Sequence, residues 1–286
     1  LEDIDALIIE LQDTGCRYGY VTKILLNLFA DLKEAKSEIS IFIIDRLNPS
    51  GRQVEGTMGQ LGVPHRHGLT VGELANLFHS EFNAKFHLHI ISANVESVNR
   101  ELMPWSIPPF TDFSGLFTSN FYSGTCLYMG TNVSYGHGTT RPFECFGAPW
   151  MEPLFGYLKE HNIATWNSKE SPVYDKSLYI RWHRFIPAYG MYSNKTCFGF
   201  HFMFIPGNEY HALNHTLKCL RFVREQFPEF TADNLEKYLE DDMLLSYVYG
   251  EIDDEMLKEY VKTEEQKWLR KAKKYILYDE APYRVK

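Results

Sequence analysis

The chain has 286 residues, and its 29 lysines and arginines against 37 aspartates and glutamates give a formal net charge of −8. This charge argues against a nucleic-acid or anionic-membrane partner, because phosphate groups are bound by basic surfaces. The five cysteines form no CxxC pair, which argues against a structural zinc site, and no apolar run has the length of a signal peptide or a membrane span.

The first predicted elements alternate between strand and helix. The predicted strands are residues 4–11, 39–44 and 86–91, and the predicted helices are residues 20–35 and 70–82. The first two strands are continuous apolar runs, typical of strands buried on both faces of a parallel sheet. Thr70 and Glu73 have the spacing of a capping box, so Glu73 is expected to cap its helix rather than to act in catalysis. This order predicts an α/β fold with a Rossmann-like parallel sheet, in which ligands bind at the C-terminal ends of the strands.

The second half of the chain mixes strands and helices in another order. The predicted elements are a helix over 151–162, strands over 178–185 and 197–205, a helix over 209–227, and charged helices over 233–278, the last a surface helix. The segment 136–150 is rich in Gly, Pro and Thr and fits no helix or strand period. We therefore predict two domains, a Rossmann-like domain over residues 1–110 and an α+β subdomain over residues 111–286, with a cleft between them.

Polar residues gather at the ends of the predicted strands and in the loops. The candidate site residues are Asp13, Arg17, Asp45, Arg46, Asn48, Glu55, Arg66, His67, Asn132, His137, Arg141 and Glu144. Two carboxylates across a cleft are what glycoside hydrolysis usually requires, and nearby arginines favour a substrate that carries its own carboxylate. The GxGxxG, Walker and GxSxG patterns are absent, so neither a phosphate-binding loop nor a serine hydrolase is indicated.

Several of these residues have an equally good structural interpretation. Asp13 and Asp45, at the ends of strands, can bind turn amides or cap helices. The two histidines of residues 65–67 are expected to be hydrogen-bonded loop residues, because no third metal ligand accompanies them. Arg141 and Glu144 can pair with each other and hold their loop. The residues alone therefore lead only to an α/β protein with a site lined by carboxylates and arginines.

Five segments carry a more specific resemblance. They are LQDTGCRYGY (11–20), DRLNPSGRQVEG (45–56), PHRHGLTVGELANLF (64–78), GTCLYMGTN (124–132) and GTTRPFECFGAPW (138–150). With these motifs in this order, the chain resembles the exo-β-N-acetylmuramidase (NamZ-like) family of peptidoglycan glycoside hydrolases. The resemblance extends over essentially the whole chain.

The resemblance implies a Rossmann-like domain and a second subdomain, with the active site in the cleft between them. We expect no cofactor and no metal. The implied activity is the removal of N-acetylmuramic acid from the non-reducing end of peptidoglycan fragments. Glu144 or Asp13 would be the catalytic carboxylate that acts with an acid upstream of this sequence. The other candidates would bind a muramic acid-containing glycan, whose lactyl carboxylate suits the arginines.

Some features depart from the family pattern. Family members carry sequence before the first strand, including a G-P-E-H-G motif with a candidate catalytic glutamate, so the chain is expected to lack the N-terminal part of the sheet. Met129 and Tyr135 stand where Glu is usual, and His137 stands where Arg is usual. A catalytically degenerate member is therefore a second hypothesis, a sugar-binding or structural component whose incomplete sheet edge a partner chain could cover.

Overall fold

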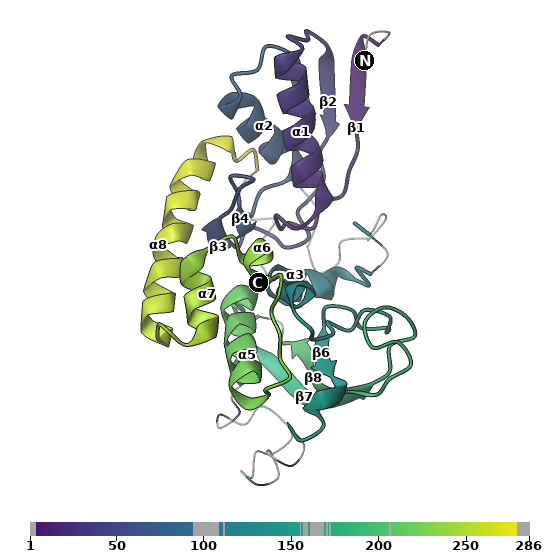
Figure 1. Ribbon diagram of the computed structural model, residues 1–286. Coiled ribbons are helices and arrows are strands. Elements are labelled where there is room, and N and C mark those ends of the chain that lie inside the picture. Colours follow the sequence, from purple (N-terminus) through teal and green to yellow (C-terminus); the bar gives the residue numbers. More distant parts are fainter. Residues whose placement is uncertain are drawn as a thin grey trace. The chain divides into compact units, whose positions relative to one another are not determined.

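The computed structural model describes residues 4–278 except 94–108, 111, 155, 157–159, 161–168, 170, 172 and 206. The chain divides into two compact units (Figure 1). Unit 1 consists of Leu1–Pro109 and Thr263–Lys286, and unit 2 of Phe110–Lys262. The sequence predicts that residues 263–278 belong to the second domain, whereas their contacts place them in unit 1.

Unit 1 is built on a three-stranded parallel sheet. Its strands are β1 (Ala6–Ile9), β2 (Ser40–Ile44) and β5 (His87–Ile91), in the order β1-β2-β5. The crossovers contain the helices α1 (Tyr20–Glu34) and α2 (Val71–Glu81). All three strands run parallel, which confirms the predicted α/β class with a parallel sheet. The C-terminal end of every strand therefore lies at the same edge.

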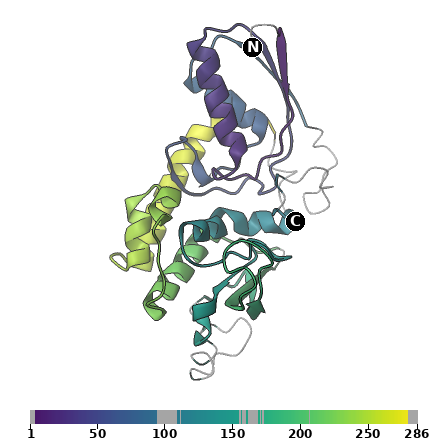
Figure 2. The same ribbon diagram turned by 45° about the vertical axis from the view of Figure 1, so that its right-hand side comes forward.

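One face of this sheet forms the core of unit 1. Ile41 and Ile43 of β2 are fully buried against the apolar stripes of both helices, which include Phe29 of α1 and Phe78 of α2. Figure 2 shows the two helices on the same side of the strands. The apolar residues of these helices recur at helical spacing, which is why the sequence predicts them well.

The other face of the sheet is more exposed. Ile8, Phe42 and His89 are register partners across the three strands, and Ile8 is 66% exposed. The rings of Phe42 and His89 stack with their centroids 4.6 Å apart. The prediction that residues 4–11 form a strand buried on both faces is therefore wrong for β1. The physical reason is that α1 and α2 both lie against the opposite face.

The last long helix, α8 (Asp254–Ala272), contributes to the core of unit 1 through its C-terminal part. Trp268 is fully buried in the same apolar cluster as α1 and α2, and its indole nitrogen donates to the carbonyl of His67 at 2.9 Å. Charged residues at i, i+4 spacing predict a surface helix here, and they do form the outer face. The buried Trp268 nevertheless anchors the helix, followed by the short turn η5 (Lys273–Tyr275).

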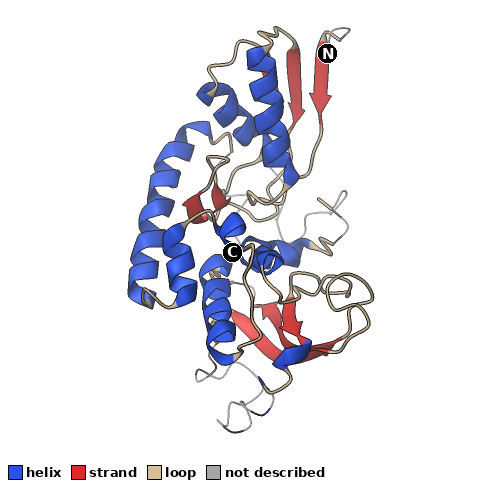
Figure 3. Cartoon of the chain, in the orientation of Figure 1, coloured by secondary structure: helices blue, strands red, loops and turns tan. Residues whose placement is uncertain are grey.

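Unit 2 contains a three-stranded antiparallel sheet (Figure 3). Its strands are β6 (Cys145–Ala148), β8 (Cys197–Phe204) and β7 (Leu178–Phe185), in the order β6-β8-β7. The helices of unit 2 are α3 (Ser119–Thr125), α5 (Ala212–Gln226), α6 (Leu235–Leu239) and α7 (Asp242–Tyr249), with single turns η2 (Leu116–Thr118), η3 (Cys126–Gly130) and η4 (Pro149–Met151). The predicted helix over 151–162 falls mostly outside the described residues.

The strand β6 corrects one prediction. Residues 136–150 were expected to lack regular structure, but Cys145–Ala148 pairs with β8. All four residues of β6 are buried, so the sequence shows no alternation that would reveal a strand. Gly147 is required there, because a Cβ atom would lie 2.4 Å from the carbonyl oxygen of Phe198.

One face of the unit 2 sheet is aromatic. Phe146 of β6 packs on Phe200 and Phe202 of β8, with ring centroids 5.5 and 5.4 Å apart. Phe202 in turn packs edge-on against His215 of α5 at 4.9 Å, so α5 covers this face. None of the helices that the structure describes has the length and apolar character needed to cross a lipid bilayer.

Replacement of the buried tryptophan tests the role of α8 in unit 1. We expect Trp268→Ala to lower the free energy of unfolding by about 3–5 kcal/mol, because it leaves a cavity in the core. The neighbouring Leu269 is 50% exposed, and Leu269→Ala is the matched control, expected to stay within about 0.5 kcal/mol of wild type. Urea unfolding measures both variants, and equal effects would contradict the assigned packing of α8.

Candidate functional site

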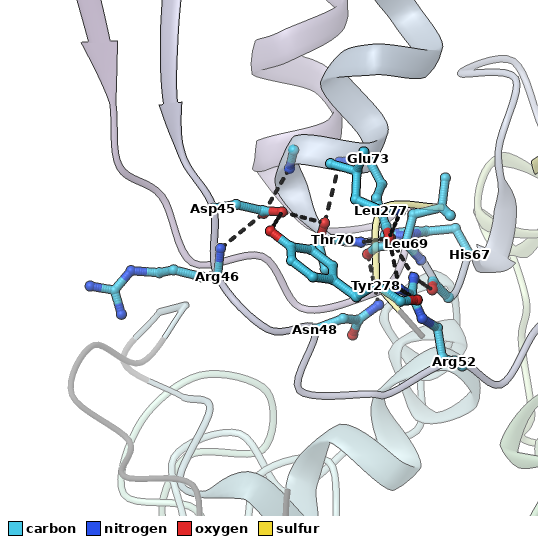
Figure 4. Close-up of polar contacts among 12 residues, drawn as sticks. Asp45, Arg46, Asn48, Arg52, His67, Leu69, Thr70, Glu73, Leu277 and Tyr278 are labelled. Carbon is cyan, nitrogen blue, oxygen red and sulfur yellow. Dashed lines mark hydrogen bonds and ion pairs between the residues drawn. The ribbon is translucent and has the colours of Figure 1, made fainter. Parts of the chain in front are cut away.

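The carboxylate of Asp45 lies at the C-terminal end of β2 and accepts four hydrogen bonds (Figure 4). Oδ1 accepts from the backbone nitrogens of Gly72 at 2.8 Å and Arg46 at 2.9 Å. Oδ2 accepts from the hydroxyls of Thr70 at 2.7 Å and Tyr278 at 2.8 Å. This arrangement joins the end of β2, the start of α2 and the C-terminal segment. Asp45 is therefore a structural carboxylate.

Burial dominates the ionisation of this cluster. The pKa of Asp45 is raised because its carboxylate is buried, although its four hydrogen bonds act in the opposite direction. Burial, followed by the nearby Asp45 charge, raises the pKa of Tyr278 to about 12. Gly72 leaves room for the carboxylate, since a Cβ atom there would lie 2.6 Å from Asp45 Oδ2.

The capping box predicted for α2 is confirmed. Thr70 Oγ1 accepts from the backbone nitrogen of Glu73, and Glu73 Oε2 accepts from the backbone nitrogen of Thr70 at 2.8 Å. Glu73 is fully buried, and both of its oxygens also accept from the guanidinium of Arg52. The backbone nitrogen of Leu277 donates to Oε1 at 2.8 Å. Glu73 thus holds the helix start, a loop and the C-terminal segment together.

Asp13 and His67 form a buried pair. His67 Nε2 lies 3.0 Å from Asp13 Oδ2, which also accepts from the backbone nitrogen of Gly15 at 2.8 Å. The backbone nitrogen of Leu69 donates to His67 Nδ1 at 3.1 Å, so the proton of this imidazole is on Nε2 and points at Asp13. Asp13 Oδ1 is buried and has no hydrogen-bond partner among the described residues. This oxygen is available to a donor from a ligand or water.

The predicted substrate-binding arginines of unit 1 make internal contacts. Arg66 pairs with the fully buried Glu55 at 2.8 Å, and its second terminal nitrogen donates to a backbone carbonyl. Arg17 donates to the carbonyl of Thr57 at 2.9 Å and lies 3.2 Å from His65 Nε2. These contacts fix the hairpin of β3 (Glu55–Met58) and β4 (Pro64–Arg66), which the sequence did not indicate.

The remaining two candidates of unit 1 have different surroundings. Asn48 is buried, donates to the carbonyl of Leu69 at 2.9 Å and accepts from the backbone nitrogen of Ser50 at 2.8 Å. The side chain of Arg46 points away from the Asp45 cluster (Figure 4). It pairs with the carboxylate of Glu10. Asn48 therefore shapes its loop, and Arg46 is the more accessible of the two.

In unit 2, Glu144 precedes β6 and is 6% exposed. Thr118 Oγ1 donates to Glu144 Oε1 at 2.8 Å, and Arg141 Nη1 donates to Oε2 at 3.1 Å. The side chain of Arg141 is 57% exposed, so one side of the carboxylate is held by an exposed surface cation and the other by a buried hydroxyl. Arg141 and Glu144 do pair, as the structural interpretation of the sequence proposed.

Tyr135 and His137, two of the residues that depart from the pattern of the resemblance, contact each other within the loop of residues 135–144. Tyr135 stacks on Phe143 with centroids 4.8 Å apart and on His137 at 5.6 Å. His137 Nδ1 lies 2.5 Å from Asp112 Oδ2. The pKa of Tyr135 is raised, first by burial and then by the Asp112 charge. Aromatic stacking therefore occupies the positions of Tyr135 and His137, where the resemblance implies charged residues, while Met129 is exposed.

Asn132 binds a segment of unit 2 that is distant in sequence, residues 229–231. Its side-chain amide donates to the carbonyl of Glu229 at 2.7 Å and accepts from the backbone nitrogen of Thr231 at 2.9 Å. The backbone carbonyl of Asn132 also accepts from the hydroxyl of Tyr192 at 2.7 Å. Asn132 thus has a clear role as a structural link.

The described residues contain no group of three or more His, Cys, Asp or Glu side chains that could hold a metal ion. All five cysteines are unpaired and buried. The candidate site therefore consists of two local groups, one around Asp13 in unit 1 and one around Glu144 in unit 2. Sequence reasoning missed Thr118, the hydroxyl partner of Glu144, because its segment shows no clear pattern.

Two family models match the chain. The model for the N-terminal part of exo-beta-N-acetylmuramidase NamZ matches residues 1–108, and the model for its C-terminal part matches residues 120–278. A curated relative, the peptidoglycan beta-N-acetylmuramidase NamZ of Bacillus subtilis (strain 168), is 26% identical over 296 residues. This match covers 97% of the chain and 68% of the relative.

Two solved structures share the fold, both of them DUF1343 family proteins from Bacteroides fragilis NCTC 9343. One has a TM-score of 0.72 at 21% identity and covers 97% of this chain and 76% of its own. The other has a TM-score of 0.77 at 20% identity and covers 98% of this chain and 76% of its own. At these identities the likeness concerns the fold.

Replacement of Asp45 tests the buried carboxylate through the pH dependence of stability. Because the folded pKa is raised, the stability contributed by Asp45 is fully present below its ordinary value of 3.8 and is lost as pH rises through the folded pKa. We expect the unfolding free energy of wild type, relative to Asp45→Asn, to be largest below pH 3.8 and to decrease as the pH rises above that value.

Urea unfolding over this pH range measures the difference. Asp31 of α1 is exposed, and Asp31→Asn is the matched control, for which no comparable decrease is expected. A difference between wild type and Asp45→Asn that does not change with pH would contradict the assigned ionisation.

Proposed function

We propose that this chain, which belongs to the exo-beta-N-acetylmuramidase NamZ family, is a glycoside hydrolase that removes terminal N-acetylmuramic acid from peptidoglycan fragments. Family models match both halves of the chain, and the Bacillus subtilis relative is named for this activity. The proposal depends on one observation. Glu144, in the motif GTTRPFECFGAPW (138–150), is a nearly buried carboxylate.

The surroundings of Glu144 suit one of the two roles in glycoside hydrolysis. Both of its partners, Thr118 Oγ1 and Arg141 Nη1, are hydrogen-bond donors, as an ionised carboxylate requires. An ionised carboxylate can activate a water molecule, attack the anomeric carbon or stabilise the positive charge that develops on the sugar ring. We therefore assign Glu144 to the base or nucleophile role rather than to the proton donor.

Asp13 is the alternative candidate for the catalytic carboxylate. Its Oδ2 is held by His67 and Gly15, whereas Oδ1 is buried without a hydrogen-bond partner among the described residues. Leaving a buried carboxylate oxygen without a donor is unfavourable, which supports a bound water or a substrate hydroxyl there. The other candidate carboxylates, Asp45 and Glu55, already have strong internal partners.

A non-catalytic, sugar-binding member remains the second candidate function. The observation that favours it is the stacking of Tyr135 and His137, two of the three residues that replace charges usual in the family. Such a protein would bind N-acetylmuramic acid without turnover. Binding and turnover therefore have to be measured on the same preparation.

Replacement of Glu144 tests the proposed catalytic role. We expect Glu144→Gln to lower kcat on an aryl β-N-acetylmuraminide by about 10²–10⁴-fold, because the amide keeps the shape but not the charge. Glu152 is exposed in the same unit, and Glu152→Gln is the matched control, expected to keep wild-type kcat. Thermal unfolding verifies that both variants are folded.

Three results decide between the hydrolase and the sugar-binding function. Unchanged turnover in Glu144→Gln would exclude this assignment. Wild-type protein that binds N-acetylmuramic acid but releases no aryl group would establish the sugar-binding alternative. Turnover of an aryl β-N-acetylglucosaminide at the same kcat/KM would show that the lactyl carboxylate is not recognised.

A further inference from the structure

The face of the unit 2 sheet opposite the aromatic one carries cationic and imidazole side chains. Arg181 and His183 alternate along β7 and therefore share a face. His201 of β8 is the register partner of Arg181, and paired residues on neighbouring strands point to the same side. None of these three residues belongs to the sites described above.

Arg181 is held in one orientation but keeps one edge free. Its Nε donates to His201 Nδ1 at 2.9 Å. Its two terminal nitrogens make no hydrogen bond, and no carboxylate pairs with them, within the part of the chain that the structure describes. The free edge of a guanidinium with two parallel N–H groups matches the two oxygens of a carboxylate.

His201 supports this orientation as a neutral ring. Because Arg181 Nε can only donate, His201 Nδ1 is the acceptor and the ring proton is on Nε2. The ring is 4% exposed, and its Nε2 has no acceptor among the described residues. A buried donor without an acceptor marks a polar site that is not satisfied by the protein itself.

A pocket of about 580 Å³ opens over this face. It is lined by Gly138, Thr139, Thr140, Arg141, Arg181, His183, Phe185 and Ile186. The loop of residues 138–141 approaches the backbone of Tyr189 closely, since a Cβ atom at Gly138 would lie 2.2 Å from the carbonyl oxygen of Tyr189. The pocket volume suits one sugar residue with a substituent.

The charges around the pocket leave one positive charge uncompensated. Arg141 pairs with Glu144, so these two charges offset each other. Burial lowers the pKa of His201 to about 4, with Arg181 as the next cause, and burial with Arg181 also lowers the pKa of His183. Both rings are therefore neutral near pH 7, and Arg181 remains as a single unpaired cation. A carboxylate would supply the single negative charge that neutralises this cation.

We propose that Arg181, oriented by His201, binds the carboxylate of the glycan substrate in this pocket, with His183 and Thr140 at its margin. The inference rests on the proposed function for the identity of the glycan, but the unpaired guanidinium and the pocket are independent of it. It places the specificity for an acidic sugar in unit 2, on residues outside the family motifs described above.

Isothermal titration calorimetry tests the proposal by comparing two ligands. N-acetylmuramic acid is the probe, and N-acetylglucosamine, which lacks the carboxylate, is the comparison ligand. We expect wild-type protein to bind the acid at least about tenfold more tightly, and Arg181→Gln to remove this preference. Arg184 lies on β7 on the opposite face and is exposed, so Arg184→Gln is the matched control and is expected to keep the preference. Arg181→Lys, which keeps the charge but not the two parallel donors, is expected to be intermediate.

The wild-type comparison of the two sugars remains decisive even where Arg181→Gln does not fold. Equal affinity for both sugars, or an unchanged preference in Arg181→Gln, overturns the proposal. Binding of inorganic phosphate that depends on Arg181, without a preference for the acidic sugar, also overturns it. Turnover with unchanged KM in Arg181→Gln would contradict this inference and leave the proposed function standing. Arg181-dependent binding without turnover would support this inference and contradict the proposed hydrolase function.

Discussion

A carboxylate that leaves water needs hydrogen-bond donors, and unit 1 is organised around meeting that need at Asp45. Its four donors come from β2, from the first turn of α2 and from the C-terminal segment, through Gly72, Arg46, Thr70 and Tyr278. Removing any donor leaves a buried charge partly unsatisfied, which costs more than the lost hydrogen bond alone. The edge of the sheet where a Rossmann-like protein binds ligands is thus occupied, on this side, by a structural network.

The same principle separates residues that build the site from residues that remain available to a ligand. Arg17 and Arg66 use their guanidinium groups on internal carbonyls, His65 and Glu55. Among the described residues, Arg181 uses only Nε internally, and we propose that its other edge binds a ligand. The type of residue is therefore a poor guide to substrate contact, and the number of donors already used within the protein is a better one.

Sequence patterns predicted the fold better than they predicted the site. The helices α1 and α2 and the strands β2, β5, β7 and β8 all follow from apolar periodicity, and the capping box at Thr70 follows from spacing alone. The strand β6 and the β3–β4 hairpin escaped prediction, because they are short and buried without alternation. The pairing of Arg181 with His201 depends on register between two strands, which a single sequence does not encode locally.

The sequence motif makes Glu144 a candidate site residue, and the structure shows its pairing with Arg141, which is one of the two interpretations of these residues. Its second partner, Thr118, lies 26 residues away in a segment with no recognisable pattern. Distances of this kind are set by tertiary packing, so no propensity or motif predicts them.

The hydrogen bond between Tyr278 and Asp45 joins residues 233 positions apart in the chain. A ribosome releases the N-terminal strands and helices of unit 1 long before Trp268 and Tyr278 are made. During that interval the first part of unit 1 lacks an indole from its core and a donor from its buried carboxylate. Unit 2, which is continuous in sequence, can complete its contacts first. Until the segment that contains Trp268 and Tyr278 has been made, the nascent chain thus holds an unfinished unit 1, and this is the period in which it depends most on protection from aggregation.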